Sequence, residues 1–143
     1  MIVSAWNPIE IKDMALPPCH YAFQVYVNNG KLDLVWQQRS ADVFLGLPYD
    51  IAMYGLLLEM LSKGSNLVPG MLIGQLGDCH LYNNHLEATK KLISISKYNL
   101  PYLSLKTGLS IGDDDMLAIP DNSDIELNNY KSHASIYAKL NVG

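Results

Sequence analysis

The sequence predicts a single α+β domain in which a mixed β-sheet packs against a long buried helix. Three observations favour this fold class. The chain has 143 residues, which suits one hydrophobic core and is short for two. Its hydrophobic fraction of 49% and charged fraction of 17% are those of an ordinary globular protein. Strand-like and helix-like segments follow one another, with no internal repeat and no low-complexity linker.

The sequence of the first part of the chain predicts β-strands. Residues 2–6 are a short apolar stretch that runs into a proline-containing turn, and a stiff loop with two adjacent prolines follows at residues 14–18. Residues 20–27 are rich in aromatic and β-branched side chains, and residues 31–38 alternate apolar with polar ones. Between them, residues 28–30 tolerate a positive φ, so these two segments predict a β-hairpin.

A buried helix is expected over residues 47–62. Pro48 lies in its first turn and Gly64 just beyond its end, which are the positions where these residue types favour a helix boundary. Apolar side chains recur through the segment at helical spacing. They are Ile51, Tyr54, Leu57, Leu58 and Leu61.

The rest of the chain gives weaker signals. Residues 71–76 predict a strand, and residues 83–94 predict a helix whose His85 is expected on a solvated or packing face. Residues 102–105 and 125–127 are further strand candidates, with the acidic stretch Asp113-Asp114-Asp115 between them.

Charge and cysteine usage exclude several classes of protein. Ten basic and fourteen acidic residues give a net charge of -4 without a cluster of lysines, which argues against binding nucleic acid. No signal peptide and no apolar run of about 18 residues is present, so we expect a cytoplasmic protein without membrane association. Cys19 and Cys79 lack CxxC spacing, so we expect neither a metal site nor a disulfide scaffold.

Cys19 is a candidate nucleophile. It follows two prolines at the start of a predicted strand, and a thiol held by a rigid turn becomes reactive when neighbouring groups lower its pKa. The alternative is a structural role as a small buried side chain, which is common for free cysteines.

Polar residues gather at the end of the predicted hairpin and after the next strand. Arg39 is the only arginine, and with Ser40 it could bind a phosphate through charge-assisted, partly bidentate hydrogen bonds. The alternative is an exposed arginine at a strand end. His80 and Tyr82 are two residues apart, so on a strand they would share a face and could both bond a sugar hydroxyl. A half-buried polar pair is the alternative there.

Four motifs, in order and at comparable spacing, resemble those of thymidylate synthases. They read SAWNP at residues 4–8, MALPPCH at 14–20, QRSADVFLGLP at 38–48 and GDCHLYNNHLE at 77–87. The resemblance is dense from residue 1 to about residue 90 and thin afterwards. It implies a thymidylate-synthase-like fold, with the mixed sheet and the buried central helix in one catalytic domain over residues 1–143.

The resemblance also implies a methyltransferase reaction, the reductive methylation of dUMP to dTMP with 5,10-methylenetetrahydrofolate as co-substrate. Cys19 resembles the thiolate that adds to C6 of the pyrimidine and makes C5 a nucleophile. Arg39 and Ser40 resemble the phosphate-binding pair, and Arg39 would also favour the thiolate. His80 and Tyr82 resemble the ligands of the 3′-hydroxyl of the deoxyribose.

Four more residues receive a role through the resemblance alone. Asp42 resembles the carboxylate that bonds the pterin of the folate, and Gly46 belongs to the same folate-contacting motif. Gln38 is counted among the substrate-binding residues. Tyr130 is a fainter match to another contact with the sugar.

Asp50 departs from the family pattern, because thymidylate synthases carry Pro-Phe-Asn-Ile where this chain has Pro-Tyr-Asp-Ile at residues 48–51. An asparagine amide accepts from N3–H and donates to O4, which selects uracil. An ionised aspartate only accepts, whereas a protonated one donates to N3 and accepts from an exocyclic amine, which suits cytosine. The related deoxycytidylate hydroxymethylases carry aspartate here, so a dCMP or dUMP hydroxymethylase using the same folate is the alternative function.

Met1 stands where the upstream half of the family would end. In the family, that half supplies an arginine pair that reaches the partner's phosphate, a glutamate used in proton transfer and several folate contacts. We therefore expect a C-terminal fragment or one half of a split gene, with the N-terminal part of the fold missing. It would act as a homodimer or with a complementing N-terminal half. An inactive nucleotide-binding remnant is the second alternative.

Overall fold

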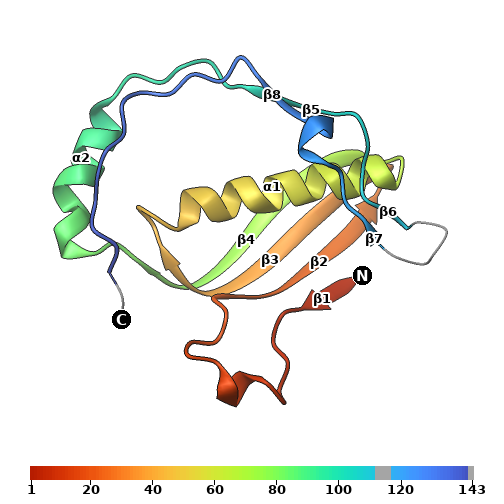
Figure 1. Cartoon of the computed structure of the whole chain (residues 1–143), viewed down its shortest axis with the longest axis horizontal. Helices are drawn as coiled ribbons and strands as arrows, with labels where there is room; N and C mark the ends of the chain where they lie inside the picture. The colour runs from red at the N-terminus through yellow and green to blue at the C-terminus, as the bar shows by residue number, and fades with distance from the viewer. Residues whose placement is uncertain (112–116, 142–143) are drawn as a thin grey trace.

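The computed structural model describes residues 1–111 and 117–141. Within them, one mixed sheet has the strand order β1-β2-β3-β4 (Figure 1). Its strands are β1 (Ile2–Ser4), β2 (His20–Asn28), β3 (Lys31–Asp42) and β4 (Val68–His80). The pairs β1/β2 and β2/β3 are antiparallel, and the pair β3/β4 is parallel. The predicted mixed sheet is therefore confirmed.

Helix α1 (Leu47–Gly64) packs on one face of this sheet and begins with Pro48 in its first turn. Every second residue of β3 from Leu32 to Gln38 is buried, because alternate side chains of a strand point to the same face. On the helix, burial is limited to one side, since Ile51 and Met53 remain 47% and 50% exposed. The core cluster consists of Leu32, Leu34, Trp36, Tyr54 and Leu58.

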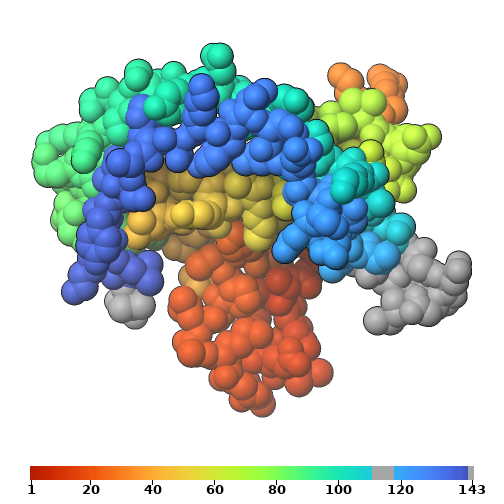
Figure 2. Space-filling model, turned by 45° about the horizontal axis from the view of Figure 1, so that its top comes forward, coloured from red at the N-terminus to blue at the C-terminus, as the bar shows by residue number. Residues whose placement is uncertain are grey.

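The remainder of the chain wraps around the helix. Helix α2 (Leu86–Ser94) follows β4, and β5 (Tyr102–Leu105) pairs antiparallel with β8 (Ile125–Asn128). Figure 2 shows this later part of the chain along one side of α1, whereas the N-terminal residues protrude on another side. The short elements are η1 (Ile11–Asp13), η2 (Asn83–His85), β6 (Ser110–Ile111), β7 (Leu117–Ala118) and η3 (Asn122–Asp124).

Several boundaries differ from the sequence-based expectation. Strands β3 and β4 are longer than predicted because they pair with each other as far as Asp42 and His80, beyond the apolar alternation on which the prediction rested. The helix expected over residues 83–94 is divided into the 3₁₀ turn η2 and helix α2. The acidic stretch 113–115 lies outside the described residues.

Two glycines allow the loop before β6 to dock on the end of α1. A Cβ atom on Gly64 would overlap the carbonyl oxygen of Leu109, and one on Gly108 would overlap the backbone nitrogen of Gly64. The Leu109 amide also donates to the Met60 carbonyl at 3.0 Å, so a backbone hydrogen bond holds the loop against the last turn of the helix. The backbones can approach this closely only without side chains.

We therefore expect Gly64→Ala to lower the free energy of unfolding by about 1–3 kcal/mol, since the overlap falls on backbone atoms. Gly55→Ala is the matched control on the same helix, because its Cβ would meet Leu72 at an ordinary 3.8 Å. That control should be neutral or stabilising by about 1 kcal/mol. Urea unfolding of both variants checks this, and equal midpoints would contradict the close approach.

Candidate functional site

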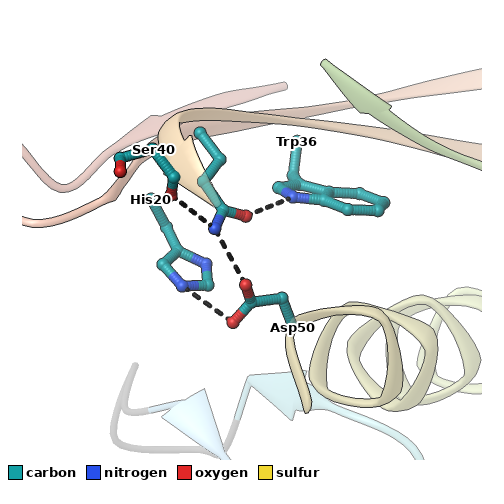
Figure 3. Close-up of polar contacts among 5 residues, drawn as sticks. His20, Trp36, Ser40 and Asp50 are labelled. Carbon is teal, nitrogen blue, oxygen red and sulfur yellow. Dashed lines mark hydrogen bonds and ion pairs between the residues drawn. The ribbon is translucent and has the colours of Figure 1, made fainter. Parts of the chain in front are cut away.

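A buried amide connects the sheet to the start of α1. Gln38 is only 3% exposed, and its Oε1 accepts a hydrogen bond from the Trp36 indole at 3.1 Å. Its Nε2 donates to the Ser40 carbonyl and to Asp50 Oδ2, both at 2.8 Å (Figure 3). All the hydrogen-bonding capacity of this amide nitrogen is therefore used inside the protein.

The Asp50 carboxylate lies between two donors. Its Oδ2 faces Gln38 Nε2, and its Oδ1 lies 3.1 Å from His20 Nε2 (Figure 3). His20 Nδ1 is buried and has no hydrogen-bond partner among the described residues. A proton there would be unpaired, so we assign it to Nε2, where it bonds Asp50. Both carboxylate oxygens therefore act as acceptors, which is the behaviour of an ionised group.

Tyr54 packs beside this network. Its ring stacks on Trp36 with centroids 5.1 Å apart and lies 5.6 Å from the His20 ring. Burial raises the pKa of the Tyr54 phenol above its usual 10.0, and the negative charge of Asp50 raises that pKa further. The phenol is therefore held neutral beside the carboxylate.

Arg39 is joined to the loop that precedes Cys19. Its backbone amide donates to the Cys19 carbonyl at 2.9 Å, and its Nη2 donates to the Pro17 carbonyl at 2.7 Å. Arg39 Nε is buried without a partner among the described residues. Cys19 itself is half-buried and forms no disulfide. The only guanidinium of the chain thus fixes the position of the candidate nucleophile.

The parallel pairing of β3 with β4 brings the other candidate ligands together. Ser40 is the register partner of Asp78, and Asp42 is the partner of His80. Ser40, His80 and Tyr82 line one open cavity of about 450 Å³. The His80 and Tyr82 rings meet edge to face at 4.9 Å. Polar side chains from two strands therefore converge on one hollow.

The turn between β3 and α1 is built around Asp42. Its Oδ1 accepts from the backbone amides of Phe44 at 2.9 Å and Leu45 at 3.2 Å, and its carbonyl accepts from Gly46 N at 3.1 Å. A Cβ on Gly46 would come within 3.3 Å of that carbonyl oxygen, so a small residue suits the turn. Asp42 and Gly46 are thus held side by side.

Tyr130 is the one candidate that the structure leaves apart. Its side chain is 60% exposed, and it does not line the cavity formed by Ser40, His80 and Tyr82. Conversely, local sequence patterns do not identify His20 as a ligand. The signal that could have identified it is strand register, because His20 is paired with Gln38 and both side chains reach Asp50.

In the part of the chain that the structure describes, no group of three or more His, Cys, Asp or Glu side chains could hold a metal ion. No helix there is long and apolar enough to cross a membrane.

Comparison with known proteins points to one family. The family model for thymidylate synthase matches residues 1–142. The thymidylate synthase of Staphylococcus haemolyticus is 45% identical, over 99% of this chain and 42% of that protein. The thymidylate synthase of phage T4 is 46% identical, over 99% of this chain and 52% of that protein. The thymidylate synthase of Mycoplasma pneumoniae is 42% identical, over 99% of this chain and 47% of that protein. The chain therefore spans about half the length of the curated relatives it matches.

The buried amide leads to a test with a neighbouring control. Gln38→Leu leaves the Trp36 indole without its acceptor and Asp50 without one of its donors, so the free energy of unfolding should fall by about 1–3 kcal/mol. Gln37→Leu should change it by less than about 0.5 kcal/mol, because Gln37 points away from α1 and only its 3.4 Å contact with Gln75 is lost. Urea unfolding measures both, and equal losses would contradict the role of Gln38.

The raised pKa of Tyr54 predicts a loss of stability at alkaline pH. Above pH 10.0 the unfolded chain gives up the phenol proton before the folded chain does, so the free energy of unfolding falls as the pH rises through the folded-state pKa. Tyr54→Phe should remove this part of the loss. Urea unfolding at neutral pH and above pH 10 compares the two chains, and parallel pH curves would show that Tyr54 does not contribute.

Proposed function

The chain belongs to the thymidylate synthase family, and we propose that it carries the substrate-binding and nucleophilic residues for the reductive methylation of dUMP to dTMP. The observation that carries the proposal is the convergence of polar groups along the parallel pair β3/β4. Ser40, His80 and Tyr82 line one cavity, and Arg39 is bonded to the loop that presents Cys19. A nucleoside monophosphate needs an anion-binding end, a hydroxyl-binding end and a nucleophile, and these residues offer all three.

At the phosphate end, Arg39 and Ser40 are the proposed ligands. Arg39 is half-buried, and of its guanidinium nitrogens only Nη2 has a protein acceptor among the described residues, so donors of this side chain remain available to an anion. At the sugar end, His80 and Tyr82 would bond the 3′-hydroxyl. Tyr130 does not line this cavity, so the proposal does not depend on it.

Cys19 would add through its sulfur to C6 of the pyrimidine, which makes C5 a carbon nucleophile. When bound, 5,10-methylenetetrahydrofolate supplies the one-carbon unit and then the hydride that completes the methyl group. The C5 proton is lost to solvent before the hydride arrives, and expulsion of the Cys19 thiolate then frees the product. Asp42 and Gly46 are the proposed folate contacts, and the turn that holds them together supports this role.

The environment of Asp50 supports uracil over cytosine as the base. An ionised carboxylate can accept the N3–H of uracil, because each of its oxygens has two acceptor sites. Cytosine presents a lone pair at N3, so it needs a protonated carboxyl group. In the structure both Asp50 oxygens accept, from His20 and Gln38, so neither is arranged as a donor toward N3 of cytosine. The dCMP hydroxymethylase alternative is therefore not favoured.

We further propose that the upstream half of the family fold packs against α1, β1 and β2. A cavity of about 420 Å³ lies there, and most of its lining is apolar. Val3 and Met53 in this lining are 40% and 50% exposed. A homodimer would use the opposite sheet face, where Tyr26 is 68% exposed and Ile73 37%. Burial of such apolar surface is the main driving force for association.

The test is tritium release from C5-labelled dUMP in the presence of 5,10-methylenetetrahydrofolate. The chain is assayed alone and mixed with the upstream half of the phage T4 relative. We expect the mixture to release tritium and form dTMP in equal amounts. Cys19→Ser should lower the rate by about a thousandfold or more. Cys79→Ser is the matched control and should leave it unchanged, since Cys79 is exposed and does not line the Ser40 cavity.

Each other outcome has a defined meaning. Release from labelled dCMP with a hydroxymethylated product would replace the proposal by the hydroxymethylase alternative. Binding of dUMP without tritium release in the mixture would indicate the inactive nucleotide-binding remnant. Full activity of Cys19→Ser would remove Cys19 from the reaction.

A further inference from the structure

His85 is a fully buried imidazole at the end of η2. Its Nε2 lies 2.8 Å from the carbonyl oxygen of Lys139, in the C-terminal segment. Because a carbonyl only accepts, Nε2 carries the proton and donates it. His85 Nδ1 is buried and has no hydrogen-bond partner among the described residues.

The residue before His85 holds the same segment. Asn84 and Asn141 exchange two side-chain hydrogen bonds, at 3.2 Å and 3.0 Å. Asn141 Nδ2 also lies 3.4 Å from His85 Nε2, and since both atoms are donors this is a packing contact. Residues 84 and 85 therefore attach the C-terminal segment at residues 139–141.

On its other side, the His85 ring touches both parts of the proposed ligand site. Its centroid lies 5.6 Å from that of Tyr82, which in turn meets His80 edge to face. It also lies 5.5 Å from the Phe44 ring, and the Phe44 amide donates to Asp42. One side chain thus contacts a proposed sugar ligand, the proposed folate-binding turn and the C-terminal segment.

A purely packing role does not explain this choice of residue. An apolar side chain would fill the space without leaving a buried nitrogen unpaired, which is a cost to stability. The imidazole provides what an apolar side chain lacks, a directional bond to Lys139 that fixes the plane of the ring. The edge-to-face contact with Tyr82 depends on that plane.

We infer that His85 is a positioning residue. It holds the Tyr82 ring and the turn at residues 42–46 in a fixed position relative to the C-terminal segment. The inference rests on the proposed function only for the identity of the ligands. Loss of the bond to Lys139 would free residues 139–141 and, at the same time, release the orientation of the Tyr82 ring.

The test compares three variants of the full chain without any ligand. His85→Leu cannot donate to Lys139, whereas His85→Gln retains an N–H close to the position of Nε2. His133→Leu is the matched control, because His133 Nε2 bonds the Ser96 carbonyl at 2.9 Å and the ring stacks on Tyr98 at 4.4 Å. It removes a bond of the same kind from the same segment without touching Tyr82.

We expect the backbone of residues 139–141 to become more mobile in His85→Leu, seen as lower ¹⁵N order parameters, with shifted NMR signals of the Tyr82 ring. His85→Gln should restore both readouts. His133→Leu should lower the order parameters around residues 131–134 and leave the Tyr82 signals in place. Affinity for dUMP, measured in the reconstituted mixture, should fall in His85→Leu and recover in His85→Gln.

Asn141→Ala tests the same coupling with a second substitution. This variant can be measured even if His85→Leu does not fold. It removes the paired amides, so the signals of the His85 and Tyr82 rings should shift. Unchanged Tyr82 signals while the order parameters of residues 139–141 fall would overturn the inference, as would failure of His85→Gln to restore them. Order parameters and ring signals require no ligand, so absence of dUMP binding would contradict the proposed function and not this coupling.

Discussion

The parallel pairing of β3 with β4 is the contact on which the site depends. Residues 38–42 and 78–82 are far apart in the sequence, and their side chains share a cavity only because Ser40 pairs with Asp78 and Asp42 with His80. A shift by one residue would turn every side chain of one strand to the opposite face. The core residues of β3 fix this register, since Leu32, Leu34 and Trp36 must all face α1.

The second constraint is electrostatic. A carboxylate close to a hydrophobic core is costly unless donors surround it, and Asp50 has both Gln38 and His20. These two donors come from different strands, so the charge of Asp50 ties β2 and β3 to the first turn of α1. The same charge raises the pKa of Tyr54 and keeps that phenol neutral. The proposed base recognition at Asp50 and the packing of the core therefore depend on one network.

Local patterns predicted the hairpin, helix α1 and the mixed sheet, because these follow from alternation, helical spacing and turn residues near each other in the chain. The motif resemblance selected the residues that line the Ser40 cavity. What could not be predicted depends on tertiary pairing. The polar ends of β3 and β4 are strands only because each completes the other's hydrogen bonds, and His20 and His85 acquire partners from distant segments, Asp50 and Lys139.

The parallel register also determines the order in which the chain can fold. The hairpin β2/β3 closes through a short turn, so it can form as soon as residue 42 is available. The pair β3/β4 must wait for the whole of α1, because closing a longer loop costs more chain entropy and slows folding. Ser40 and His80 can therefore meet only after α1 has been made, whereas the bond from Arg39 to the loop that precedes Cys19 needs only the hairpin.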